Sequence, residues 1–141
     1  MLFQHQCQFS KRMEMINITN QIKKDVKQSQ IQNGIVVVYT PHTTAGITVN
    51  ENADPDVVRD MLNGYERVFP TEHPDYRHFE GNSHSHMKST LFGASQTFIL
   101  SKGQILLGIW QGIYLCEFDG PRRRQYYVKI ISDNNDVIVI D

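Results

Sequence analysis

The stretch QTFILSKGQILLGIWQGIYLCEFDGPRRRQYYVKIIS, residues 96–132, sets the fold class of this chain. Its apolar and β-branched runs are separated by the turn sequences SKGQ and DGPR, a pattern typical of consecutive antiparallel strands. Upstream, Gly34–Pro41 and Ala45–Glu51 have the same character and predict two more strands around a polar corner. Residues 2–18 interleave apolar and polar side chains, which favours one or two further half-buried strands.

Three segments have helical patterns. The first is expected to begin with Thr19 as its N-cap residue and to stop at Asn33-Gly34. The second begins at Asp54-Pro55, because Asp accepts the free N–H groups of a first helical turn and Pro has no N–H to leave unpaired there. The third follows a polar loop over residues 69–82, begins at Asn82 or Ser83 and ends at Gly93. We therefore expect an α+β fold, a single small domain with mixed or antiparallel β-sheets and about three helices.

Length and charge exclude several classes of protein. The chain has 141 residues and a formal net charge of −1, so it has too little positive charge for a broad nucleic-acid footprint. It is shorter than the roughly 250 residues of a (β/α)8 barrel, and its apolar runs are shorter than the roughly 18 residues that span a bilayer. Cys7 and Cys116 lie far apart, and no long apolar leader opens the chain. We expect a cytoplasmic protein that binds neither nucleic acid nor membrane.

Histidines gather in one part of the sequence. Four of the six lie between His73 and His86, and His42 occupies the polar corner between two predicted strands. Imidazole is a common metal ligand and a general acid or base, although ordinary surface histidines remain the alternative. On a helix, His84 and His86 would lie about 200° apart, so they do not readily serve one ion. His86 shares a polar face with Asn82 and is the better candidate for a site.

Glu117 is a second candidate, because it is expected on the same strand face as Ile113 and Leu115. A carboxylate on an apolar face needs a partner. It could orient a histidine, hold a cation or pair with an arginine such as Arg122 across the DGPR turn. Cys116, in contrast, is interpreted as a small buried hydrophobic residue rather than a nucleophile.

Three motifs together resemble the YjbQ-like family, also described as secondary thiamine-phosphate synthases. They are HTTAGITVNE with the following Asp-Pro (residues 42–55), YRHFEGNSHSHMK (76–88) and GIWQGIYLCEFDGPR (108–122). The resemblance covers residues 1–132, which we expect to form a single YjbQ-like domain. Residues 133–141 lie outside the pattern and are expected to extend the same domain, with DVIVI as an edge strand or a partner contact.

The resemblance implies a homotrimer with a polar pocket that holds a divalent metal ion, zinc or magnesium. The metal ligands that match the motifs are His42, His78 and His86. The expected substrate-binding residues are Thr43, Thr44, Asn82, Lys88, Trp110 and Arg122, and the expected catalytic residues are Glu51 and Glu117. His84 falls where the family pattern has no histidine, so no role is assigned to it.

The activity that the resemblance implies joins a pyrimidine-methyl pyrophosphate to a thiazole phosphate with loss of pyrophosphate. Such a site needs cationic donors or a metal on the leaving group and protection of the reactive carbon from water. The histidines, Lys88 and Arg122 would supply the donors, and Trp110 would stack on the pyrimidine. Two alternatives stay open. One is a metal-dependent hydrolase of a small phosphate ester or amide, with Glu51 or Glu117 as the base, and the other is a non-catalytic metal- or ligand-binding protein.

Overall fold

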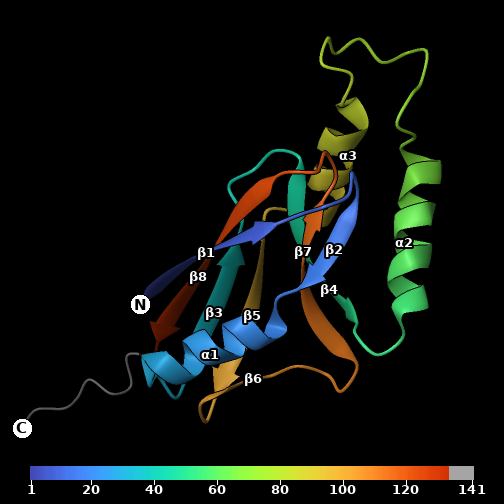
Figure 1. Cartoon of the computed structure of the whole chain (residues 1–141). Helices are drawn as coiled ribbons and strands as arrows, with labels where there is room; N and C mark the ends of the chain where they lie inside the picture. Colours follow the sequence, from blue (N-terminus) through green and yellow to red (C-terminus); the bar gives the residue numbers. More distant parts are fainter. Residues whose placement is uncertain (134–141) are drawn as a thin grey trace, which may run out of the picture.

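Two antiparallel sheets and three helices make up the described part of the chain, residues 1–133 of the computed structural model (Figure 1). The five-stranded sheet has the order β1 (Leu2–Gln8), β8 (Arg123–Ser132), β3 (Gly34–Tyr39), β5 (Ser95–Ser101), β6 (Gln104–Ile105). The three-stranded sheet has the order β2 (Glu14–Asn17), β7 (Gln111–Glu117), β4 (Ala45–Glu51). The helices are α1 (Thr19–Ser29), α2 (Pro55–Val68) and α3 (Ser83–Phe92). The predicted α+β class is confirmed, and every strand pair over residues 1–133 is antiparallel.

The late stretch of the sequence supplies the central strand of each sheet. In the larger sheet, β8 pairs with both β1 and β3, and in the smaller sheet β7 pairs with both β2 and β4. The run of antiparallel strands predicted over residues 96–132 is therefore present, but the turn after β7 carries the chain from one sheet to the other. This turn therefore connects the two sheets.

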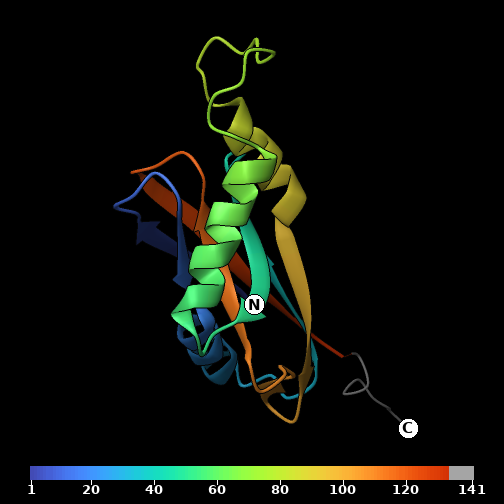
Figure 2. The ribbon, with the colours of Figure 1, turned by 90° about the vertical axis from the view of Figure 1, so that its right-hand side faces the viewer.

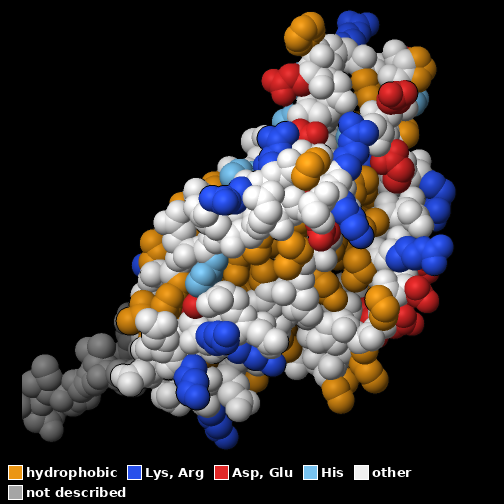
Figure 3. Space-filling model, viewed as in Figure 1, with side chains coloured by type: hydrophobic (Ala, Val, Ile, Leu, Met, Phe, Trp, Pro, Cys, Tyr) orange, Lys and Arg blue, Asp and Glu red, His pale blue; other side chains and the backbone are white. Residues whose placement is uncertain are grey.

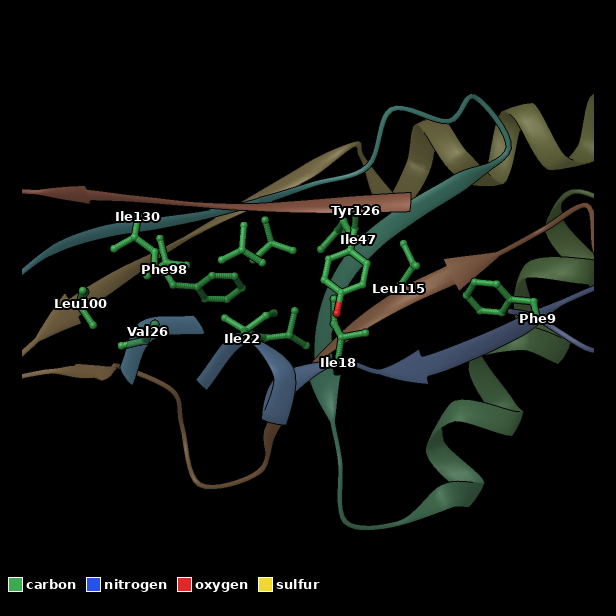
Figure 4. Packing of buried hydrophobic residues seen from close by; sticks show 14 residues of the cluster. Phe9, Ile18, Ile22, Val26, Ile47, Phe98, Leu100, Leu115, Tyr126 and Ile130 are labelled. Carbon is green, nitrogen blue, oxygen red and sulfur yellow. The ribbon is translucent and has the colours of Figure 1, made fainter. Parts of the chain in front are cut away.

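The main core lies between the larger sheet, the smaller sheet and α1 (Figure 4). Alternate residues of β8, among them Tyr126, Val128 and Ile130, point into it, as the period of two in a strand requires. Helix α1 contributes Ile22 and Val26, which lie four residues apart on one helical face. This packing fixes the position of β8, and with it the position of the turn between β7 and β8.

Strand β7 is buried on both faces. Ile113 and Leu115 belong to the main core, whereas Tyr114, Cys116 and Phe118 pack with Phe92 of α3 in a second, smaller cluster. The face division predicted from the sequence is confirmed. Burial raises the pKa of the Cys116 thiol well above its ordinary value, which agrees with its interpretation as a buried hydrophobic residue.

The ends of α1 differ from the sequence prediction. Thr19 is the first helical residue and not the N-cap, because its side chain is engaged elsewhere. Its hydroxyl donates to Asn17 Oδ1 over 2.6 Å and accepts from the Ile113 N–H over 2.8 Å. The helix stops at Ser29, where Gln30 adopts a left-handed conformation with φ 60°, and not at Asn33-Gly34.

Helix α2 begins as predicted, with the Asp54 side chain accepting from the Asp56 N–H over 2.9 Å and Pro55 in the first turn. It runs beside α3 on the outside of the smaller sheet, and none of its residues is fully buried (Figure 2). Residues 69–82 join the two helices as a loop that projects from the body of the molecule, which confirms the predicted loop (Figures 1 and 2). Apolar side chains reach the surface over the middle of the face seen in Figure 3.

Within residues 1–133, no helix is both long enough and apolar enough to cross a membrane. The expected cytoplasmic location and the expected lack of nucleic-acid binding stay predictions. The extension expected over residues 133–141 lies outside the described residues apart from Asp133, whose N–H donates to the Asn33 carbonyl over 2.9 Å.

Candidate functional site

One hollow is lined by residues from the start of α3, the corner between β3 and β4 and the turn between β7 and β8. Figure 1 shows these three segments at the end of the molecule where α3 begins. Its volume is about 460 Å³. Its lining residues are Pro41, His42, Thr43, Thr44, His78, Glu80, Asn82, His86, Asp119, Arg122 and Arg124.

Strand pairing and close helix packing bring these segments together. Ala45 of β4 lies opposite Glu117 of β7, which places residues 41–44 beside the turn that follows β7. Helix α3 lies so close against β4 that a Cβ atom on Gly46 would come within 2.8 Å of the Phe92 Cβ. The Ser89 hydroxyl of α3 also donates to the Ala45 carbonyl over 2.6 Å. These contacts hold the second half of α3 against β4.

His42 uses its lone pair within the protein. The Gln125 backbone N–H donates to His42 Nε2 over 2.9 Å. Burial lowers the pKa of His42 below its ordinary value, and the positive charge of Arg124 lowers it further. A neutral imidazole has one lone pair, so this His42 carries its proton on Nδ1 and acts there as a donor.

His78 and His86 contact one another in the hollow. Their ring centroids lie 5.5 Å apart and their planes make an angle of 87°. His78 comes from the loop before α3, and His86 from α3 itself. His84, two residues earlier on the helix, is fully buried and does not line the hollow, in line with the roughly 200° separation expected from the spacing.

Glu117 is paired with an arginine, which was one of the predicted options, but the arginine is Arg124 and not Arg122. Arg124 Nε donates to Glu117 Oε2 over 2.6 Å, and Arg124 Nη2 donates to Glu117 Oε1 and to Thr44 Oγ1. The Glu117 side chain is fully buried and that of Arg124 is 3% exposed. This two-pronged contact holds the β3–β4 corner against β7 and β8, and it leaves Glu117 without the free oxygen that a general base needs.

Asp119 organises the rim of the hollow. It accepts from Arg122 Nη2 over 3.0 Å and from Asn82 Nδ2 over 2.9 Å. Because a carboxylate only accepts, this contact fixes the orientation of the Asn82 amide. Asn82 Oδ1 is then the one buried side-chain nitrogen or oxygen atom of residues 1–133 without a hydrogen-bond partner. Such an atom costs about 1–3 kcal/mol.

Seven of the predicted site residues line the hollow, namely His42, Thr43, Thr44, His78, Asn82, His86 and Arg122. Glu117 lies beside it, as the partner of Arg124. The structure does not bring Glu51, Lys88 or Trp110 to it. Glu51 ends β4 at the far end of the strand, opposite Gln111, and Trp110 precedes β7 there with an exposed fraction of 59%. Lys88 is fully buried on the other side of α3.

Sequence reasoning missed Glu80, Asp119 and Arg124. Asp119 lies in the DGPR turn. Arg124 is two residues before the buried Tyr126 and so lies on the same face of β8. The period of two therefore carried a signal for a buried arginine, although nothing local identified its partner.

The predicted metal centre does not fit the residues as they are placed. Over residues 1–133, no three His, Cys, Asp or Glu side chains are arranged to hold an ion. His42 would also have to give up its bond from Gln125 to offer a lone pair. The metal stays a prediction from the resemblance.

Comparison with known proteins supports the motif resemblance. The sequence model of the family described as "UPF0047 protein YjbQ-like" matches residues 4–133. The chain belongs to this family. It is 52% identical over 133 residues to the UPF0047 protein MJ1081 of Methanocaldococcus jannaschii, covering 94% of this chain and 96% of that protein. It is also 52% identical over 127 residues to YugU of Bacillus subtilis, covering 90% and 96%.

Solved structures of the family have the same fold. A Clostridium acetobutylicum protein described as an ortholog of YugU superposes with a TM-score of 0.90 at 53% identity, over 92% of this chain and 99% of that one. A Sulfolobus solfataricus protein described as of unknown function gives a TM-score of 0.91 at 29% identity, over 94% and 97%. The UPF0047 family is thus established for this chain, whereas these names specify no reaction.

Proposed function

We propose that the hollow at the start of α3 is an active site that joins a pyrimidine-methyl pyrophosphate to a thiazole phosphate, with loss of pyrophosphate, to form thiamine phosphate. The observation that carries the proposal is the meeting of three histidines and Arg122 at one end of a ten-residue helix. The specific reaction is the one that the motif resemblance implies.

Several groups around the hollow can donate hydrogen bonds to an anion. The first turn of α3 presents backbone N–H groups and the positive end of the helix dipole. His42 offers its Nδ1–H, and the Thr43 and Thr44 hydroxyls line the same wall. The charges of Asp119 and Glu117 are each matched by an arginine, at 3.0 Å for Arg122 and in a two-pronged contact for Arg124. A phosphate therefore meets donors rather than uncompensated carboxylates, apart from Glu80.

The proposed reaction balances without an added reactant. The bond between the methylene carbon and the pyrophosphate oxygen breaks, and its electron pair leaves with the pyrophosphate. The thiazole nitrogen then uses its lone pair to form the new carbon–nitrogen bond. Donors on the departing oxygen stabilise the charge that develops there. His78 and His86, which contact one another, are the groups that we assign to this oxygen.

This assignment changes the roles expected for the carboxylates. Glu117 positions Arg124 and does not act as a base, and Glu51 lies outside the site. Trp110 does not stack on the substrate in this proposal, and Lys88 does not contact it.

The test is formation of thiamine phosphate from its two halves by the purified chain, measured by chromatography and mass spectrometry with and without added zinc or magnesium. We expect product from the wild type and none from His86→Ala. The matched control is His73→Ala, the same substitution at a loop histidine that lies outside the hollow. No product from the wild type, or product that survives His86→Ala, contradicts the proposal.

The two alternatives predict different results in parallel assays. A metal-dependent hydrolase would release phosphate from small esters and lose that activity with a chelator. It is the weaker candidate, because neither Glu51 nor Glu117 is available as its base. A non-catalytic protein would retain a phosphorylated ligand without forming product.

A further inference from the structure

A second cluster of polar side chains lies behind α3, on the side away from the hollow. Lys88, His84 and Ser85 are all fully buried there. None of them lines the hollow, and the proposed reaction does not use them. A buried ammonium group is costly unless it is fully paired, so its presence calls for a physical role.

Lys88 has an acceptor for each of its three protons. Its Nζ lies 2.8 Å from Glu66 Oε1, 2.8 Å from His84 Nδ1 and 3.5 Å from Met13 Sδ. Glu66 belongs to α2, Met13 lies just before β2, and Lys88 and His84 belong to α3. One side chain therefore joins three segments that are distant in the sequence.

The contacts beyond Lys88 follow in a single direction. Because an ammonium group can only donate, His84 Nδ1 must accept, and the imidazole proton must be on Nε2. His84 Nε2 then donates to Ser85 Oγ over 3.1 Å, and the Ser85 hydroxyl donates to the Phe118 carbonyl. The hydrogen-bond chain runs from Glu66 through Lys88, His84 and Ser85 to the end of β7.

The two ends of this series of hydrogen bonds fix segments that lead to the lining of the hollow. At one end, Glu66 accepts from the backbone N–H of Thr71 over 2.6 Å and from its hydroxyl over 2.8 Å, at the base of the loop that carries His78. At the other end, Phe118 directly precedes Asp119, which binds Asn82. The loop over residues 69–82 is thus fixed near both of its ends.

We propose that Glu66, Lys88 and His84 are positioning residues that set the rotation of α3 and the base of the 69–82 loop, so that His78 and His86 meet in the hollow. His86 lies two residues from both His84 and Lys88 in the sequence. A rotation of α3 that breaks these buried hydrogen bonds therefore also turns His86 away from His78. The proposal rests on the proposed function only for its activity measurement.

The primary test is spectroscopic and needs no substrate. In the full chain labelled with ¹⁵N-histidine, Lys88→Met should displace the imidazole signals of both His78 and His86. Lys24→Met, the same substitution at an exposed lysine of α1, should leave them in place. Unchanged His78 and His86 signals in a folded Lys88→Met variant would overturn the proposal.

Two milder variants keep the test decisive if Lys88→Met does not fold. Glu66 is 39% exposed, so Glu66→Gln is expected to fold while weakening the contact with Lys88, and it should still move both signals. His84→Asn keeps an acceptor for Lys88 and should move the His86 signal less than His84→Phe, which removes both bonds. Unmoved signals in Glu66→Gln, or equal shifts for the two His84 variants, would show that these hydrogen bonds do not set the geometry.

Activity gives an independent measurement. Glu66→Gln should lower kcat for thiamine phosphate formation about tenfold while KM changes less than about twofold, as expected for displaced catalytic groups with intact binding. A loss in KM alone would count against positioning. If the wild type forms no thiamine phosphate, the proposed function fails. The imidazole signals alone then still decide the role of the buried hydrogen bonds.

Discussion

Glu117 and Arg124 determine how the corner that carries His42 is held. Arg124 lies on the same face of β8 as Tyr126 and reaches across to both oxygens of Glu117 in β7. It also donates to the Thr44 hydroxyl in the corner between β3 and β4. Glu117 Oε1 also accepts from the Asp119 N–H over 2.8 Å. With both charges buried, removal of either partner leaves the other uncompensated.

Arg124→Met should therefore reduce the free energy of unfolding by about 3–5 kcal/mol, because it leaves the Glu117 carboxylate buried without its partner. The double variant Arg124→Met with Glu117→Leu should recover most of this loss, since neither charge remains. Urea unfolding followed by circular dichroism measures both values. A single variant as stable as the wild type would contradict this account of the pair.

Glu66 makes the free energy of unfolding depend on pH in the acid range. Burial tends to raise the pKa of its carboxyl, but hydrogen bonds from Lys88 and Thr71 outweigh that effect and lower the pKa from 4.5 to about 2. The unfolded chain therefore takes up this proton at a higher pH than the folded chain. The stability contributed by Glu66 is fully present above pH 4.5 and is lost as the pH falls toward 2.

Glu66→Gln should accordingly flatten the dependence of stability on pH over this acid range. Thermal unfolding at a series of pH values in the wild type and the variant measures the difference. Glu80→Gln provides a control, because Glu80 is exposed and has no ion pair within residues 1–133. Parallel pH curves for the wild type and Glu66→Gln would contradict the expectation.

At the scale of elements, the close approach of β3 and β8 depends on Gly34. Its φ is 155°, and a Cβ atom there would lie 1.9 Å from the Ile131 carbonyl oxygen. The Asn33-Gly34 pair was expected to end a helix, but the helix has already ended at Ser29. The glycine is needed instead because the backbone of the neighbouring strand occupies the space of a side chain.

Gly34→Ala should destabilise the fold by about 2 kcal/mol or more, because the clash is with backbone that cannot move aside cheaply. Gly64→Ala is the matched control. Gly64 lies within α2, and an added Cβ atom would meet only Arg67 Nη2, at 3.7 Å. This control should stabilise the protein by about 0.5–1 kcal/mol, since alanine favours a helix. Equal effects of the two substitutions would refute the argument from close approach.

At the scale of the whole molecule, the outer face of the larger sheet carries an apolar row. Ile35 lies opposite Ile99 on one side and opposite Ile131 on the other. Their exposed fractions are 37%, 60% and 45%. Contiguous exposed apolar side chains are typical of surfaces that bind another protein. This row is consistent with the homotrimer that the family resemblance implies, which we retain as a proposal.

We therefore expect the purified chain to have the mass of a trimer in light scattering coupled to size-exclusion chromatography. Ile99→Lys should shift it toward the monomer, because a charge in the row, at its most exposed residue, would be buried without a partner on assembly. Thr97→Lys places the same charge two residues earlier on β5, on the same face of the sheet. It tests how far the contact between subunits extends along the strand. A monomeric wild type would contradict the expectation.

Local patterns were sufficient for much of the architecture. The period of two predicted the opposite faces of β7, the Asp-Pro pair predicted the start of α2, and the polar stretch predicted the loop over residues 69–82. Each of these depends on residues a few positions apart, whose relation the backbone geometry fixes. The three motifs also identified the family, because their order along the chain is itself a sequence property.

The partners of buried charges could not be obtained in this way. Arg124 rather than Arg122 binds Glu117, and Lys88 turns away from the hollow to bind Glu66, 22 residues earlier in the chain. Trp110 and Glu51 lie in matching motifs but at the far end of their strands. Strand register and helix packing determine which partners lie within reach of a charged side chain. A buried charge pairs with the partner whose hydrogen bonds best compensate for the loss of hydration. That choice is made between distant segments, so it arises only when the sheets and helices have packed.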